Sequence, residues 1–245
     1  MRQKILTFAL VVLWTPYGFA NGLNIPSFTT DELGGAIEAW AGDHTWYECG
    51  EALQGEARKS RAQQYARYFK RVADKYKVPT IFLSSIVEQE SGYDECAIGF
   101  VARQKAELPA HPTYTEVKRK LGYPWTRKRY GISYFDVGAA QFLWPRGSYK
   151  NITKGVELRD VMSMEWSVDT LGKMLVEYRA YAQDYYSRGY HFRNSRGYYK
   201  RIPPQFGYFI HHNSPDASNH QYYFNVRRKA KRILVHILRG RQRES

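Results

Sequence analysis

The feature that most constrains the fold is a set of apolar stripes with helical spacing. The longest stripe recurs every three or four residues and predicts a helix over residues 161–186; its members are Met164, Val168, Leu171, Leu175, Tyr178 and Ala182. Shorter stripes predict helices over residues 60–77 and 79–91. A last stripe predicts a C-terminal helix; it consists of Val226, Ala230, Ile233 and Ile237. Because few stretches alternate at period two, as half-buried strands do, we expect a mainly α fold.

Two segments show no clean period. Residues 99–135 hold three prolines among many aromatic and basic residues, and residues 185–208 interleave Tyr with Arg and Gly. We expect both to be long ordered loops, and such loops in compact domains often carry function. Their aromatic side chains either stack on a ligand or pack against the protein, and the pattern leaves both readings open.

The first twenty residues have the three parts of a secretory signal peptide. Residues 1–4 carry positive charge and residues 5–14 are almost wholly apolar. Gly18 and Ala20 are small residues suited to a cut after Ala20. A membrane anchor is the alternative, but the apolar run is about half of the ~20 residues that a span needs. We therefore expect a cleaved signal peptide over residues 1–20 and a periplasmic or secreted protein.

The chain contains two cysteines, Cys49 and Cys96. In an oxidising compartment they can form one disulfide, which would tie the N-terminal segment to the region after residue 90. Two free buried thiols are the alternative reading.

The chain is strongly basic, with 37 Lys and Arg against 23 Asp and Glu and a formal net charge of +14. Such a balance attracts polyanions. An exported protein meets cell-wall polymer and anionic lipid first, and no motif typical of nucleic-acid binding is present. We therefore expect an anionic partner other than nucleic acid.

The segment from residue 79 to residue 93, PTIFLSSIVEQESGY, carries the most chemical information. Three apolar residues precede Glu90 at helical spacing and place it on the apolar face; they are Val87, Ile86 and Leu83. Glu88 is about 200° round the helix from Glu90 and is expected to face solvent. Gly92 is placed to end the helix as its C′ residue.

Glu90 would thus lie on a buried face at the negative end of a helix dipole. Desolvation and the dipole both favour the neutral carboxyl and raise its pKa. A group that must hold a proton near neutral pH and give it to a leaving oxygen needs this environment. A buried glutamate satisfied by a neighbour, or a helix end turned to solvent, is the non-catalytic alternative.

Three further motifs follow Glu90 along the chain. Residues 138–142 read Gly-Ala-Ala-Gln-Phe, residues 212–215 read His-Asn-Ser-Pro, and Tyr222 lies near the start of the C-terminal stripe. Together with Glu-Ser-Gly-Tyr at residues 90–93, this order resembles the lysozyme-like lytic transglycosylases. Their pattern is Glu-Ser at a helix end, then Gly-x-x-Gln, then Tyr-Asn-Ala-Gly-Pro, then a Tyr near the start of a late helix. The resemblance covers about residues 62 to 237.

The sequence departs from that pattern in two places. His212 stands where the family has Tyr, and Ser214 alone stands for its Ala-Gly. In addition, 47 residues lie between Glu90 and Gly138, so residues 99–135 are interpreted as an insertion.

The resemblance implies a helical domain of the goose-type lysozyme or SLT kind over residues 61–240, after an N-terminal extension over residues 21–60. The substrate would be the β-1,4 bond between N-acetylmuramic acid and N-acetylglucosamine in peptidoglycan. Glu90 would protonate the bridging oxygen, then accept the proton of the muramic 6-hydroxyl and leave a 1,6-anhydro end. The substrate's acetamido group would replace a second carboxylate, and no metal or cofactor is needed.

The resemblance also implies roles for other residues. Gln141 and Asn213 would hydrogen-bond sugar or N-acetyl groups, and Phe142 would line the cleft. Ser91 and Tyr222 would orient Glu90, with Tyr223 a close rival of Tyr222. For each residue a purely structural role is the alternative.

Two other functions stay open. One is hydrolysis on the same fold, with Asp136 holding a water, and the other is a catalytically inactive wall-binding or scaffold protein. Expected partners are glycan strands, with an envelope-spanning secretion or conjugation apparatus among the candidates; nothing indicates the oligomeric state.

Overall fold

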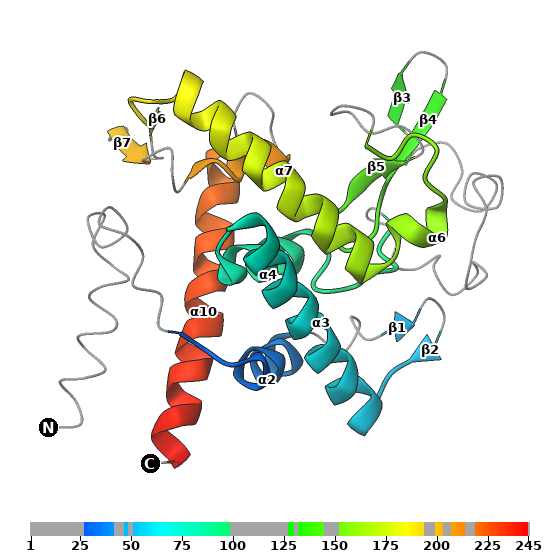
Figure 1. Cartoon of the computed structure of the whole chain (residues 1–245). Coiled ribbons are helices and arrows are strands. Elements are labelled where there is room, and N and C mark those ends of the chain that lie inside the picture. The colour runs from blue at the N-terminus through cyan, green and yellow to red at the C-terminus, as the bar shows by residue number, and fades with distance from the viewer. Residues whose placement is uncertain are drawn as a thin grey trace, which may run out of the picture.

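The computed structural model describes residues 27–41, 47–48, 51–98, 127–129, 132–144, 152–193, 199–202, 207–213 and 219–244 of the 245-residue chain. The predicted signal peptide and most of the expected insertion lie outside the described residues. Within them the protein is mainly helical (Figure 1), as the apolar stripes predict.

Five long helices build this part of the chain: α2 (Thr30–Trp40), α3 (Gly55–Tyr76), α4 (Thr80–Glu90), α7 (Met164–Tyr185) and α10 (His220–Glu244). Two short helices, α6 (Leu158–Val161) and α9 (Ile210–Asn213), precede α7 and α10. Figure 1 shows α4 at the centre, with α10 on one side and α3 and α7 on the other. Direct contacts join α4 to all three of these helices, and α2 packs against α3 and α10.

The predicted stripes are the buried faces of their helices. Every member of the α7 stripe is at most 5% exposed, and the α10 stripe is buried as well. Helix α3 begins five residues before the predicted residue 60. Its first turn contains Glu, Ala, Arg and Lys, which favour a helix but give no apolar period.

The segment expected as an N-terminal extension contributes α2 to the same core. Leu33, Ala36 and Ile37 are fully buried. A capping box fixes the start of α2, since the Thr29 hydroxyl accepts from Glu32 N at 3.1 Å and the Glu32 carboxylate accepts from Thr29 N at 2.7 Å. Arg241 of α10 pairs with the same Glu32 carboxylate, so the C-terminal helix is tied to α2.

Helix α4 is buried on all sides from Ile81 to Glu88. Helices that are enclosed in this way have no solvent face. The expectation that Glu88 faces solvent was therefore wrong: Glu88 is 4% exposed, because α10 packs on that side of α4.

Seven short strands form three antiparallel sheets in the described part of the chain. Their bounds are β1 Tyr47–Glu48 with β2 Glu51–Ala52, then β3 Arg127–Arg129, β4 Ile132–Val137 and β5 Phe142–Trp144, and last β6 Tyr190–Arg193 with β7 Tyr199–Ile202. The expectation of a loop over residues 185–208 was wrong, because β6 and β7 pair there. The C-terminal end of the expected loop over residues 99–135 is likewise paired, in β3 and β4. Strands this short give too few alternations for a period-two signal.

Cys96 is disulfide-bonded, in line with the disulfide predicted from the sequence, while Cys49 lies outside the described residues. Among the described helices, none is long and apolar enough to cross a membrane.

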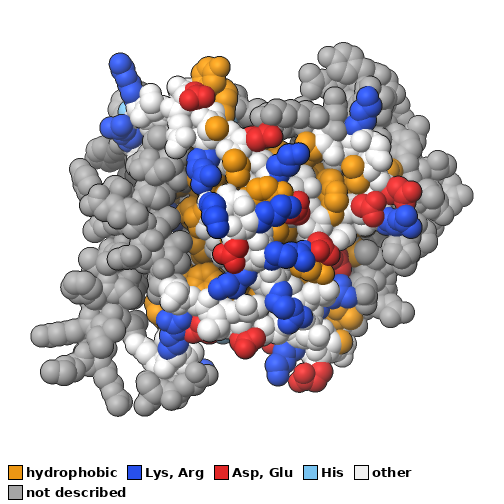
Figure 2. Space-filling view, viewed as in Figure 1, with side chains coloured by type: hydrophobic (Ala, Val, Ile, Leu, Met, Phe, Trp, Pro, Cys, Tyr) orange, Lys and Arg blue, Asp and Glu red, His pale blue; other side chains and the backbone are white. Residues whose placement is uncertain are grey.

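Ion pairs tie α3 to α7 on one face of the molecule. Figure 2 shows this face, where Lys and Arg side chains are interspersed with Asp and Glu. The Lys75 ammonium lies 2.7 Å from the Asp169 carboxylate, and Arg71 pairs with Glu165. Exposed pairs of this kind each contribute roughly 0–1 kcal/mol, so buried apolar contacts remain the main stabilisation of this helix pair.

Candidate active site

The chain turns sharply after Glu90 at the end of α4. Gly92 N donates to the carbonyl of Glu88 at 3.1 Å, and Gly92 has a φ of 66°, as expected for the residue that follows a helix. Tyr93 also has a positive φ, and its hydroxyl lies 2.9 Å from that of Ser84 inside the core. The turn directs the next residues to the sheet, where Ile98 bridges Val137 at the end of β4.

The Gly-x-x-Gln motif is fastened to the residues that follow this turn. Gly138 N donates to the carbonyl of Ala97 at 2.8 Å. The Gln141 amide group donates to the same carbonyl at 3.3 Å and to that of Gly138 at 2.9 Å. Both amide hydrogens are therefore used within the protein, and the side-chain oxygen of Gln141 is the atom that can accept from a ligand.

Gly138 occupies a position that only glycine fits. Its φ is 78°, and a Cβ added there would lie 2.2 Å from the carbonyl oxygen of Val161. The Ser167 hydroxyl donates to that same oxygen at 2.8 Å, so the backbone of Val161 is held in place. The close approach joins the turn after β4 to the end of α6, whose last carbonyl is held by Ser167 of α7.

The His-Asn motif reaches the same turn from the other side. Nε2 of His212 lies 3.0 Å from the carbonyl of Ala140, an acceptor, so Nε2 carries the proton. Nδ1 is then the acceptor nitrogen, and it is buried with no hydrogen-bond partner. Burial lowers the pKa of His212 to about 4, so the ring is neutral near pH 7. The exposed Asn213 accepts from the side chain of Asn219 at 2.6 Å, which links the motif to the start of α10.

Glu90 is partly exposed, with its Oε1 atom buried, and Tyr222 of α10 and Asp136 of β4 lie close to its carboxyl. Burial raises its pKa from the ordinary 4.5 to about 7; the nearby Tyr222 hydroxyl opposes the shift, and the negative charge of Asp136 on β4 adds to it. Oε1 of Glu90 and the Tyr222 hydroxyl are both buried, and neither makes a hydrogen bond of good geometry. A proton-holding carboxyl therefore faces a phenol from α10 and a carboxyl from β4.

The structure separates Tyr222 from its rival Tyr223. Tyr222 faces Glu90, and burial together with that carboxyl raises the pKa of its hydroxyl. Tyr223 instead stacks on Phe209 at 5.5 Å between ring centroids, with 10° between the ring planes. Of the two tyrosines, Tyr222 is therefore the one that lies close to the Glu90 carboxyl.

Two residues expected at the site make other contacts. The Ser91 hydroxyl donates to the carbonyl of Val87 at 3.2 Å and not to Glu90. Phe142 is 4% exposed and packs edge-on against Trp166 and His212, at 5.5 and 5.8 Å between centroids. Both residues support the backbone around the site.

Glu95 is a supporting residue that the sequence did not reveal. Its carboxylate accepts from Arg61 of α3 at 2.6 Å and from the backbone N of Met164 at 2.9 Å. Met164 is the first residue of α7, where a negative charge is favourable. Because the two contacts lie 34 and 69 residues away along the chain, no local pattern could have indicated them.

The arrangement is suited to proton transfer. It offers one carboxyl that is half-protonated near pH 7, a second carboxyl close enough to influence it, and the buried hydroxyl of Tyr222. In the described part of the chain, no three His, Cys, Asp or Glu side chains lie together as a metal site would require.

Comparison with known proteins adds no relative: no family model matches the sequence, and neither curated proteins nor solved structures gave a match.

The raised pKa of Glu90 predicts a pH-dependent cost to stability. The unfolded chain ionises Glu90 from about pH 4.5, whereas the folded protein holds the proton to about pH 7. The free energy of unfolding therefore decreases as the pH rises between these two values, and the folded protein becomes less stable. Replacing Glu90 by Gln should raise the free energy of unfolding by about 3 kcal/mol at pH 8, and by much less at pH 4.

Urea unfolding of both proteins at the two pH values measures this difference. Glu56→Gln removes an exposed carboxylate in the first turn of α3 and serves as the control, with no gain at pH 8. An equal effect of Glu90→Gln at both pH values would contradict the raised pKa.

Proposed function

We propose that this protein is a lysozyme-like lytic transglycosylase that cleaves peptidoglycan, with Glu90 as its general acid and base. One observation carries the proposal: the Glu90 carboxyl, whose pKa is raised to about 7, lies close to Tyr222 and Asp136, and the motifs at residues 138–142 and 212–213 are joined to one another and to the chain after Glu90 by hydrogen bonds. A helix that ends in this carboxyl beside a small antiparallel sheet is what a lysozyme-like domain requires. The fold assignment is part of the proposal.

The proposed reaction begins with proton transfer from Glu90 to the oxygen between N-acetylmuramic acid and N-acetylglucosamine. Positive charge then develops on the muramic ring, and the substrate's own acetamido group stabilises it. Glu90, now ionised, accepts the proton of the muramic 6-hydroxyl, which closes a 1,6-anhydro ring. The acid is regenerated and no water is consumed.

The neighbouring side chains have roles that follow from their contacts. The Tyr222 hydroxyl faces the carboxyl and would stabilise its ionised form in the second half of the reaction. The side-chain oxygen of Gln141 would accept from a sugar hydroxyl or an acetamide N–H. Asn213 is exposed and would make a further sugar contact. The formal charge of +14 favours an anionic polymer such as the wall.

The predicted signal peptide would bring the protein to the periplasm or the exterior, where peptidoglycan lies. An envelope-spanning secretion or conjugation apparatus, which needs a local opening in the wall, is a candidate partner.

Incubation with purified sacculi tests the proposal. Protein lacking residues 1–20 should release soluble muropeptides that are lighter by one water than the products of a muramidase, as mass spectrometry detects. Well-folded protein that releases nothing from several wall types would sink the proposal and favour a wall-binding protein without activity.

Hydrolysis is a second candidate function, because the Asp136 carboxyl lies close enough to influence Glu90 and could hold a water. Asp136→Asn separates the two. In a transglycosylase, Asp136 acts only through its charge, and removing that charge lowers the pKa of Glu90. The alkaline limb of the pH–rate profile should then shift to lower pH by roughly half a unit, and the products should still carry anhydro ends. In a hydrolase, the rate should fall about 10²–10⁴-fold. Asp74→Asn, on the exposed face of α3, should change neither property.

A further inference from the structure

Two tyrosine rings are exposed side by side at the end of α7, next to β6 (Figure 1). Among the described residues, the exposed large hydrophobic side chains are Trp40, Tyr181 and Tyr185, with exposed fractions of 39%, 39% and 72%. The rings of Tyr181 and Tyr185 lie 4.5 Å apart between centroids, with 33° between their planes. Apolar side chains that are exposed together mark an interaction surface more often than single ones do. We call these two tyrosines the aromatic platform.

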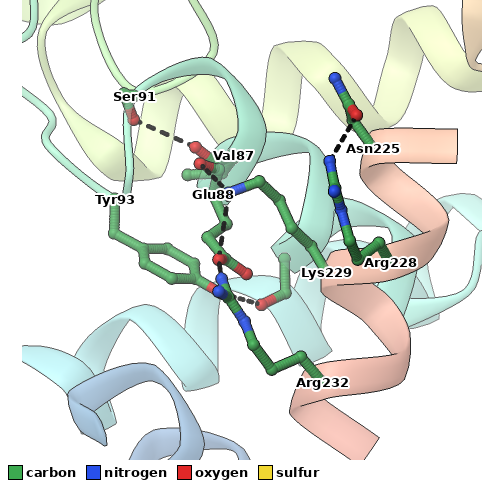
Figure 3. Close-up of polar contacts among 9 residues, drawn as sticks. Val87, Glu88, Ser91, Tyr93, Asn225, Arg228, Lys229 and Arg232 are labelled. Carbon is green, nitrogen blue, oxygen red and sulfur yellow. Dashed lines mark hydrogen bonds and ion pairs between the residues drawn. The ribbon is translucent and has the colours of Figure 1, made fainter. Parts of the chain in front are cut away.

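Trp40 differs from the platform because a cation covers its ring. The Arg232 guanidinium lies 4.5 Å from the centroid of the Trp40 ring, a cation–π distance. Figure 3 shows Arg232 extending from α10 to Glu88, with which it forms an ion pair. The rings of Tyr181 and Tyr185 instead contact other aromatic rings, and their remaining surface is open to solvent.

Partly and fully buried aromatic residues hold the platform in place. His211 of α9 is 2% exposed, and its ring lies 5.1 Å from that of Tyr181. The Tyr190 hydroxyl lies 2.9 Å from His211 Nε2, and Tyr186 stacks on Tyr190 at 4.4 Å between centroids. Tyr186 also contacts Tyr181 edge-on at 6.1 Å. Because the rings are fixed before a ligand arrives, binding loses little conformational entropy.

The platform lies along the same helix as a tyrosine of the candidate active site. Tyr178, Tyr181 and Tyr185 follow one another at spacings of three and four residues, so they lie on one side of α7. Tyr178 is one of the groups that raise the pKa of the Tyr222 hydroxyl, and Glu90 is another, so these three residues lie close together. From Tyr178 to Tyr185 the helix rises about 11 Å, which is close to the length of one disaccharide.

The chemistry of the platform favours a sugar as its ligand. The face of an aromatic ring carries negative partial charge. It therefore attracts the C–H bonds that line one face of a pyranose ring, and tyrosine adds a hydroxyl that can hydrogen-bond to the same sugar. A β-1,4-linked strand of N-acetyl sugars presents such faces along its length.

A second copy of this protein fits the platform less well. Burying a tyrosine side chain removes about 150–250 Å² of surface, so the two rings together offer less than about 500 Å². A stable protein–protein interface needs about 800 Å² from each partner. The area of the platform is therefore better matched to a few sugar rings than to a dimer.

We propose that Tyr181 and Tyr185 form an outlying binding surface for the N-acetyl sugars of a glycan strand, at a distance from the bond on which Glu90 acts. This inference rests on the proposed function and deepens it, because it names where an uncleaved part of the strand is held. The strand would extend from the Glu90 carboxyl along the C-terminal half of α7.

Calorimetric titration with a soluble hexamer of β-1,4-linked N-acetylglucosamine tests the inference. All variants carry Glu90→Gln, so that the ligand stays intact. Tyr185→Ala should weaken binding about 3–10-fold through the loss of one stacking contact, and Tyr181→Ala combined with it should weaken binding further. Tyr185→Phe keeps the ring and should bind within about twofold of the parent protein.

Gln183→Ala is the matched control. Gln183 is exposed and lies between the two tyrosines in the sequence, but it is about 200° round α7 from each of them. Its substitution should leave the affinity unchanged. Tyr181 packs on His211, so the double variant is checked for folding by circular dichroism. If that variant does not fold, Tyr185→Ala decides alone, because the Tyr185 side chain is 72% exposed.

Equal affinities of the parent and Tyr185→Ala, or no binding by the parent, would overturn the inference. A free stem peptide is titrated in parallel; if Tyr185→Ala weakened binding of the peptide and not of the hexamer, the surface would be a peptide site and the inference would fail. Binding requires no cleavage. Protein that binds the hexamer through the platform but releases nothing from sacculi would refute the proposed function alone, whereas anhydro products with an affinity independent of Tyr185 would refute the platform alone.

Discussion

Replacing Glu90 by Gln is expected to lower the rate of muropeptide release about 10²–10⁴-fold, the range typical of losing a general acid. Glutamine has nearly the same shape but cannot donate a proton of suitable acidity to the bridging oxygen. Because the substitution also removes a carboxyl whose pKa is raised in the folded protein, it should stabilise the fold near pH 8. Loss of activity would then not be a consequence of unfolding. The initial rate on purified sacculi, with circular dichroism of the same samples, measures both properties.

Glu56→Gln, on the exposed first turn of α3, should release muropeptides at the unmodified rate. A Glu90→Gln protein with a similar rate would show that the acid lies elsewhere, and Asp136 would be the next carboxyl to replace.

Replacing Gly138 by Ala is expected to destabilise the protein by about 2–4 kcal/mol. A Cβ at this position would lie 2.2 Å from the Val161 carbonyl oxygen and 3.0 Å from the Ser167 hydroxyl. The contact involves the backbone at the end of α6, which a hydrogen bond from Ser167 of α7 holds in place. A positive φ of 78° adds a second cost for any residue with a Cβ.

Gly155→Ala is a matched control for Gly138→Ala. Gly155 has the same φ of 78°, but a Cβ there would meet nothing within 4 Å. Its substitution should therefore cost about 1 kcal/mol, from the backbone conformation alone. Urea unfolding at pH 5 compares the two variants. Equal losses at the two glycines would show that the close approach to Val161 does not constrain the turn.

The helices were predictable because their buried faces repeat. The stripe of α7 gave its extent to within a few residues, since each member points into one core. Most of the strands were not predictable, because every described strand except β4 has only two to four residues. Such short strands depend on pairing with segments that are distant in the sequence. Val137, for example, pairs with Ile98, 39 residues away.

The inward position of Glu90, which is partly buried, followed from the spacing of apolar residues on α4, whereas the full burial of Glu88 did not. A stripe shows which face is most apolar but not whether another helix covers the opposite face. In this protein α10 covers that face and supplies Lys229 and Arg232 to pair with the carboxylate. When a helix is enclosed on all sides, the residues opposite its apolar stripe are buried as well, so the stripe does not predict which residues face solvent.

The order of the motifs could be read from the sequence, but their contacts could not. His212 bonds to the carbonyl of Ala140, 72 residues away, through a ring nitrogen. Gln141 uses its amide hydrogens on backbone carbonyls, including that of Ala97. Such contacts depend on the packed fold and leave no periodic trace in the chain.

The most direct test of the central claim is the reaction with sacculi in water enriched in oxygen-18. The unmodified protein should release muropeptides that lack the label and are lighter by one water than hydrolysis products, and Glu90→Gln should release almost none. Labelled products of full mass would contradict transglycosylation. Equal release by the Glu90→Gln protein would contradict the role of Glu90 itself.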